Sequence, residues 1–323
     1  MELCALMPNT INISNSNNLL PFLNYFDQQG IEWKSVAEKY QFPEDLKDGE
    51  YWLPSHQTMA FLNTIMRKSN RRIGLDVGRL ITLEQISPEL HSAFVHCDNL
   101  EQAIHTLIEV MPTLNSHVVV WPEKIEDKWY LCHRGAYHPS VSGFDQAEWF
   151  RAFALLSLCR SFLGKTWEPT SVLMSLPGHL AKNLPAAFSS VSFTFGHAFG
   201  AIEIPLSDNF IGVEPQKREH DWHTTLDALI NTYAVLPWFN VEWLAQLIGS
   251  SPRTLQRRLA DQGLTFRQSR DNARCETATK LLREKVSPFE TAWRCGYTDL
   301  SNFNRAFKGW MKKTPAQYQS QFK

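Results

Sequence analysis

The chain has 323 residues, 43% of them hydrophobic and 20% charged, with a formal net charge of −1. This length is too great for one ordinary core and suits two domains. No run of 18 apolar residues occurs, so we predict no membrane span, and the start lacks the basic-then-apolar pattern of a secretion signal. Six scattered cysteines without a CxxC pair indicate reduced thiols, and we expect a cytoplasmic protein.

The near-neutral total hides an asymmetry between the two ends of the chain. Residues 240–323 contain 15 Lys+Arg and 7 Asp+Glu, a net charge of +8. The remainder contains 17 Lys+Arg and 26 Asp+Glu, a net charge of −9. A basic C-terminal segment beside an acidic body indicates a polyanionic partner for that segment.

The acidic body mixes helical and strand-like periods. Pro112 is expected to end one of its helices, and a turn over 122–127 is expected to join two strands into a hairpin. We predict an α/β fold with a mainly antiparallel sheet. The expected helices cover 19–40, 54–69, 100–112 and 145–163, and the expected strands cover 117–121, 128–133, 171–176, 191–195 and 201–204.

These patterns predict three parts along the chain. Residues 1–213 form an N-terminal domain for effector binding or dimerisation, although no residue pattern identifies its effector-binding side chains. A polar linker with a short helix covers 214–238, and a helical domain covers 239–323. No phosphate loop, nucleophile elbow or metalloprotease motif is present. His220-Asp221-Trp222-His223 could suggest a metal site, but it lies in the polar linker without nearby cysteine ligands, so we expect no cofactor and no metal.

The helical segment opens with a helix-turn-helix pattern. Asn240 can cap a first helix that Gly249 closes, and Ser251 with Pro252 starts a second one running to residue 262. Two short helices joined by a tight glycine turn, the second rich in Arg and Gln, are typical of this DNA-binding motif.

A second copy follows a long helix that we expect from the Thr265 cap to about residue 285. Capping patterns at Ser287 and Thr314 and a cap at Asp299 start three further helices. The copies align internally: Leu255-x-Arg257-x-Leu259 matches Phe303-x-Arg305-x-Phe307. A connecting helix of about 20 residues spans about 30 Å, close to the 34 Å of one turn of B-DNA. Two reading helices so placed can enter successive major grooves.

Residues 238–322 resemble the DNA-binding domain of the AraC/XylS family. The stretch Ala292-x3-Gly296-Tyr297, then Ser301-x-Phe303-x-Arg305-x-Phe307, then Thr314-Pro315-x-x-Tyr318 carries the resemblance. More loosely, Phe195-Gly196-x-x-Phe199-x-Ala201-Ile202 is similar to the arabinose-binding-like domain of one branch of that family.

The resemblance implies which side chains read bases. Arg253, Gln256 and Arg257 fall on the first reading helix. Ser301, Asn302 and Arg305 fall on the second, where Ser301 and Asn302 could instead cap the helix. Leu300 departs from the family, since many members have a polar residue there. We expect Trp243 and Trp293, on the supporting helices, to pack in the core.

We therefore expect a sequence-specific transcriptional regulator, an activator rather than an enzyme, that binds promoter DNA and contacts RNA polymerase. A small-molecule effector or self-association into a homodimer would control it. The alternative is an alkyl-transfer repair protein that uses the same DNA-binding domain and accepts a methyl group on Cys132, in Leu131-Cys132-His133-Arg134.

Overall fold

The computed structural model describes residues 11–82, 85, 88–181, 190–213 and 222–322. They form two compact units, an N-terminal one that starts at Asn12 and a C-terminal one that includes everything described from residue 222 onward. No helix within these ranges is long and apolar enough to cross a membrane. Of the predicted linker, residues 214–221 lie outside the described ranges.

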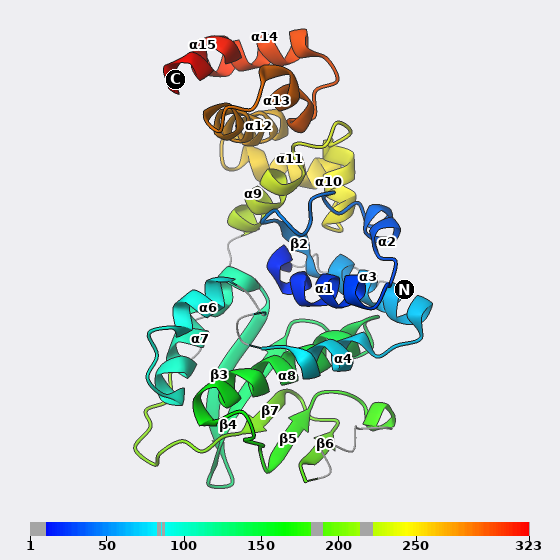
Figure 1. Cartoon of the computed structure of the whole chain (residues 1–323). Helices are drawn as coiled ribbons and strands as arrows, with labels where there is room; N and C mark the ends of the chain where they lie inside the picture. The colour runs from blue at the N-terminus through cyan, green and yellow to red at the C-terminus, as the bar shows by residue number, and fades with distance from the viewer. Residues whose placement is uncertain (1–10, 83–84, 86–87, 182–189, 214–221, 323) are drawn as a thin grey trace. The chain divides into compact units, whose positions relative to one another are not determined.

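The N-terminal unit is built on a five-stranded sheet with the order β3-β4-β7-β5-β6 (Figure 1). All its neighbours are antiparallel except β5 and β6, which confirms the predicted α/β fold with a mainly antiparallel sheet. β6 and β7 follow each other in sequence, but β5 lies between them. The strands are β3 (Val118–Ile125), β4 (Lys128–Gly135), β5 (Ser171–Met174), β6 (Ser192–Phe195) and β7 (Gly200–Glu203).

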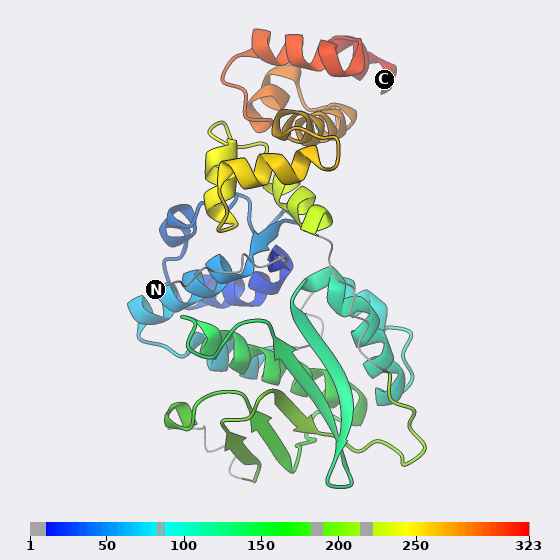
Figure 2. The ribbon, with the colours of Figure 1, turned by 180° about the vertical axis from the view of Figure 1, so that it is seen from behind.

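The β3–β4 hairpin, seen from the other side in Figure 2, is longer than its sequence pattern predicts. Only Glu126 and Asp127 form the turn, with φ angles of 48° and 65°, as a tight two-residue hairpin requires. Pro122 therefore lies within β3, opposite Leu131. The sheet tolerates it because β3 is an edge strand, where a missing N–H can face away from the ladder.

Two helical predictions for this unit need correction. The stretch 19–40 is two helices, because the chain turns at Gly30 with φ of 62°. Pro112 lies inside α7 (Leu100–Leu114) and does not end it. A proline that near the C-terminus removes a single helical hydrogen bond, and the Asn115 N–H still donates to the Met111 carbonyl.

The core of the N-terminal unit forms where helices cover the sheet. α8 (Phe144–Leu163) packs against β7 and along α4 (Ile73–Leu80), and α7 packs against β3. A short ladder pairs β1 with β2. The remaining elements are β1 (Ile13–Asn15), η1 (Ser16–Leu19), α1 (Leu20–Gln28), α2 (Lys34–Lys39), β2 (Trp52–Pro54), α3 (Ser55–Ser69), α6 (Pro88–Phe94) and η2 (Gly178–Ala181).

The C-terminal unit is all helical within its described residues, as predicted. Its first helix packs against the long central one through side chains that are almost fully buried, including Leu226, Ile230 and Tyr233. The helices are α9 (Trp222–Tyr233), α10 (Val241–Leu247), α11 (Pro252–Ala260), α12 (Phe266–Arg283), α13 (Pro288–Arg294), α14 (Leu300–Met311), α15 (Pro315–Gln319) and η4 (Ser320–Phe322).

Candidate nucleic-acid interface and ligand cavity

The first helix-turn-helix, α10 and α11, starts at the predicted caps. The Asn240 side-chain oxygen accepts the N–H of Trp243 at 2.8 Å, and Ser251 Oγ accepts the N–H of Thr254 at 3.1 Å. Leu255 and Leu259 are buried, and these anchors fix which face of α11 points outward. The side chains predicted to read DNA from this helix are all exposed: Arg253, Gln256 and Arg257.

The second helix-turn-helix, α13 and α14, repeats this arrangement with larger anchors. Phe303 and Phe307 are fully buried in a cluster that also contains Leu282 and Tyr318. The side chains predicted to read DNA from this helix are again all exposed: Ser301, Asn302 and Arg305. Each copy therefore presents three polar side chains on the outward face of its second helix.

Asp299 forms the N-cap of α14, so neither Ser301 nor Asn302 is the cap. Asp299 Oδ1 accepts the backbone N–H groups of Ser301 and Asn302 at 2.6 and 3.3 Å. Its other oxygen, Oδ2, accepts the side-chain amide N–H of Asn302 at 2.8 Å. That bond orients the Asn302 amide before any ligand is present.

Arg274, near the middle of α12, connects the two copies to α9. Its guanidinium donates to the carbonyl oxygens of Ala234 and Leu236, at 2.7 and 3.2 Å, just after α9 ends. It also lies 5.0 Å from the ring centroid of Tyr297, in the turn of the second copy. Gly296 in that turn has φ of 75°, and a Cβ there would lie 2.3 Å from the Val235 carbonyl oxygen. Only glycine fits this approach.

The prediction that both tryptophans pack in the core is borne out only in part for Trp243 and is wrong for Trp293. Trp243 is half-buried against the rings of Tyr233, Trp238 and Phe239. Trp293 is 70% exposed on α13 because no described element covers that face of the helix.

The N-terminal unit contains a cavity of about 140 Å³ lined mainly by residues of α1, α3, α6, α7, α8 and β3. Its lining is mostly apolar, with Phe22 and Phe150 in ring contact at 4.6 Å between centroids. Among the described residues, Arg151 is the only charged side chain in the lining. An apolar cavity with a few convergent polar groups is the usual form of a small-molecule site.

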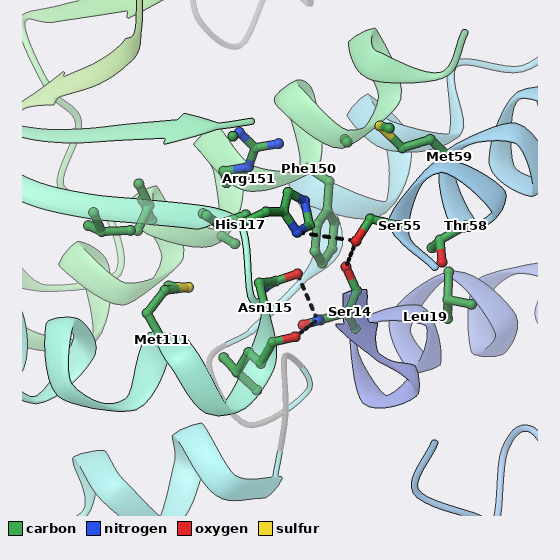
Figure 3. Close-up of a pocket in the computed structure, with 18 of the residues that line it drawn as sticks. Ser14, Leu19, Ser55, Thr58, Met59, Met111, Asn115, His117, Phe150 and Arg151 are labelled. Atoms are coloured by element: carbon green, nitrogen blue, oxygen red, sulfur yellow. Dashed lines mark hydrogen bonds between the residues drawn. The ribbon is translucent and has the colours of Figure 1, made fainter. Parts of the chain in front are cut away.

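Three polar side chains of the lining, Ser14, Ser55 and His117, are linked to one another (Figure 3). Ser55 Oγ lies 2.9 Å from Ser14 Oγ and 3.1 Å from His117 Nδ1. The Tyr137 ring meets the His117 ring edge to face at 5.4 Å. Burial and, second, the positive charge of Arg151 lower the pKa of His117 to about 3. His117 is therefore neutral near pH 7.

Arg151 has a buried counterion outside the lining. Its Nη1 lies 3.3 Å from Glu148 Oε2, and Glu148 Oε1 accepts the Ser175 hydroxyl at 2.5 Å. Burial opposes the ionisation of Glu148, but His133, Arg151 and Ser175 outweigh it and lower the pKa of this carboxyl. Burial also lowers the pKa of His133 to about 4. Arg151 and Glu148 thus form an ion pair whose net charge is zero.

Cys132, the residue on which the alkyl-transfer alternative depends, lies on β4 and is fully buried. Burial raises the pKa of its thiol to about 12. Since the thiolate is the nucleophile, the structure disfavours methyl transfer to this cysteine. No group of three or more potential metal ligands occurs among the described residues.

Comparison with known protein families matches both units. Residues 244–321 match a helix-turn-helix domain, and residues 30–208 match the arabinose-binding domain of AraC transcription regulators, N-terminal. The second match covers more than half of the chain. The chain belongs to the AraC family of transcription regulators.

Relatives with known names support the assignment. Over 161 residues the chain is 29% identical to the HTH-type transcriptional regulator VqsM of Pseudomonas aeruginosa. The aligned stretch covers 48% of this chain and 46% of VqsM. Over 80 residues it is 36% identical to the ornithine utilization regulator of the same species, 24% of each chain. The chain thus spans less than half the length of these relatives.

Among solved structures, the transcriptional regulator CdpR from Pseudomonas aeruginosa is 20% identical, with a TM-score of 0.40 over 93% of this chain and 96% of that one. The family matches confirm the resemblance that the sequence predicted. This AraC-family member has an N-terminal ligand-binding domain and a C-terminal DNA-binding domain.

The cavity residues are the part of the site that sequence reasoning missed. One signal was available: Glu148 and Arg151 are charged residues three apart in an otherwise apolar and aromatic stretch of α8. Charged side chains in such a stretch are rarely buried unless they are paired. The serines and His117 carry no comparable signal, because only the fold brings them together.

Proposed function

We propose that this regulator binds promoter DNA through α11 and α14 and that a small molecule in the N-terminal cavity controls it. The observation that carries the proposal is the equivalence of the two helices: each has buried anchors on one side and three exposed polar side chains on the other. Arg, Gln and Asn are the side chains suited to read guanine and adenine edges in the major groove.

The length of α12 supports the engagement of two half-sites. Its 18 residues span about 27 Å, about 7 Å less than one turn of B-DNA, which still holds the two reading helices well apart along one face of the duplex. Transcription activation, contacts with RNA polymerase and self-association into a homodimer belong to the same proposal. In it, the effector shifts the population toward the form that occupies both half-sites.

Footprinting of the full chain on its promoter tests the DNA-reading residues. Arg257→Ala and Arg305→Ala should each weaken specific binding by about 1–3 kcal/mol, because each removes a base or phosphate contact. Arg67→Ala is the matched control, since it removes an exposed positive charge from the N-terminal unit. If Arg257→Ala and Arg305→Ala leave the footprint intact, the assignment of the reading helices is wrong.

A cavity-filling variant tests effector control. Ala154 lines the cavity from α8, so Ala154→Leu should reduce the response of promoter binding to the effector by removing space. Basal DNA binding should stay unchanged, because the substitution lies outside the C-terminal unit. Reporter transcription in cells, with and without an extract that contains the effector, measures the response. An unchanged response would remove the cavity from the proposal.

A further inference from the structure

The volume of the cavity indicates how large a body can lie inside it. A cavity of about 150 Å³ lined by apolar side chains holds one benzene molecule. The cavity of about 140 Å³ therefore suits a single ring or a short branched chain with a small polar group. The rings of Phe22 and Phe150 provide flat apolar contact for such a body.

Arg151 lines the cavity, and its guanidinium lies beside Gly135, another lining residue. A Cβ built at Gly135 would lie 3.3 and 3.5 Å from Arg151 Nη1 and Nη2. The Arg151 side chain keeps 16% of its surface exposed. Among the described residues, Arg151 Nη1 donates to Glu148 Oε2, which uses one of its five N–H donors. The remaining donors are available to an acceptor in the cavity.

The charges around Arg151 determine which kind of hydrogen-bond acceptor a ligand can place in the cavity. Glu148 is 1% exposed and already neutralises Arg151. His117 is neutral, so the polar end of the cavity has no unbalanced positive charge. A carboxylate would bring a second negative charge beside Glu148 and lose its hydration, which is costly in a buried site. A neutral carbonyl or ether oxygen takes the same N–H groups without that penalty.

We propose that the cavity binds a compact, uncharged ligand, apolar in its body, whose acceptor oxygen receives the N–H groups of Arg151. The proposal rests on effector control of the regulator and names the chemical class of the effector. The Glu148–Arg151 pair then determines ligand specificity. Arg151 supplies charge-assisted hydrogen-bond donors, and the negative charge of Glu148 disfavours anionic ligands.

Three probes of similar shape test this on the full chain by titration calorimetry at pH 7. Acetophenone has the acceptor, ethylbenzene lacks it, and benzoate replaces the methyl group with a charged oxygen. Acetophenone should bind at least about ten-fold more tightly than ethylbenzene, the effect of one charge-assisted hydrogen bond. It should also bind at least about ten-fold more tightly than benzoate. Tighter binding of benzoate, or no binding of acetophenone, would overturn the proposal.

Two variants separate the charge argument from simple shape. Glu148→Gln keeps the outline of the side chain and removes its charge, so benzoate should gain on acetophenone by at least about ten-fold. Gly135→Ala keeps the ion pair and crowds the guanidinium, so acetophenone binding should fall while ethylbenzene binding changes little. An unchanged order of probes in Glu148→Gln, or unchanged acetophenone binding in Gly135→Ala, contradicts the proposal. If Glu148→Gln does not fold, Gly135→Ala and the wild-type order decide.

Promoter footprinting of the same preparations separates this inference from the proposed function. If the three probes bind in a different order of affinity while the promoter footprint stays intact, only the proposed ligand class is wrong. A footprint that is insensitive to Arg257→Ala and Arg305→Ala refutes the DNA-reading assignment, whatever the probes do.

Discussion

The two helix-turn-helix copies share their caps, their glycine turns and their buried anchors, but they differ in what surrounds them. On α10, Trp243 is partly covered by Tyr233, at the end of α9, and by Trp238 and Phe239. On α13, Phe289 and Trp293 are 71% and 70% exposed. Residues close in sequence determine where a helix ends. Whether the outer face of a helix is buried depends instead on a segment from elsewhere in the chain that packs against it.

The turn glycines give the largest expected difference between the copies. Gly249 and Gly296 both have positive φ, but a Cβ at Gly249 meets nothing within 4 Å. Gly249→Ala should cost about 1 kcal/mol of local stability, from backbone strain alone. Gly296→Ala adds a clash with the Val235 carbonyl and should cost about 3 kcal/mol. Hydrogen exchange of the amides of α10 and α13 measures both. Equal costs would show that the approach to Val235 is unimportant.

Arg274 gives the next largest effect and tests whether α9 stabilises both copies. Arg274→Met removes the donors to the Ala234 and Leu236 carbonyls and the contact with Tyr297, and should cost about 2 kcal/mol. The loss should appear as faster exchange in α9 and in the turn of the second copy. Arg267→Met, at an 84% exposed position of the same helix, is the control and should change stability by less than about 0.5 kcal/mol. Faster exchange in α9 alone would contradict the coupling.

The tryptophans give the smallest effect. Trp243→Ala should cost about 1.5 kcal/mol, less than a fully buried tryptophan, because only part of its ring is covered. Trp293→Ala should change the stability by less than about 0.5 kcal/mol. Urea unfolding of the full chain, followed by circular dichroism, compares the two variants. Similar losses would mean that Trp293 is covered in solution.

Most of the C-terminal unit was predictable because its signals are local. Caps at Asn240, Ser251, Thr265 and Asp299 act within three residues, and the spacing of Leu255 and Leu259 sets the outward face of α11. The six side chains predicted to read DNA are exposed as expected, while their contact with bases stays a prediction.

For the N-terminal unit, only the fold class was predictable from the sequence. The strands and their mainly antiparallel pairing follow from period and composition, but the insertion of β5 between β7 and β6 depends on contacts between distant segments. The cavity could not be predicted from the sequence for the same reason. Ser55 lies 41 residues from Ser14 and 62 residues from His117, and the three side chains meet only in the fold.

The hydrogen bonds from Arg274 to the segment after α9 affect where the chain can be truncated. The helix-turn-helix match begins at residue 244, which suggests expressing a fragment from that point. Such a fragment would lack the carbonyl acceptors at Ala234 and Leu236, and it would leave the guanidinium of Arg274, a residue that is 7% exposed, without them. It would also uncover the surface that α9 protects on α12. An independently folding piece should therefore begin no later than Trp222, well upstream of the two helices that we propose to read DNA.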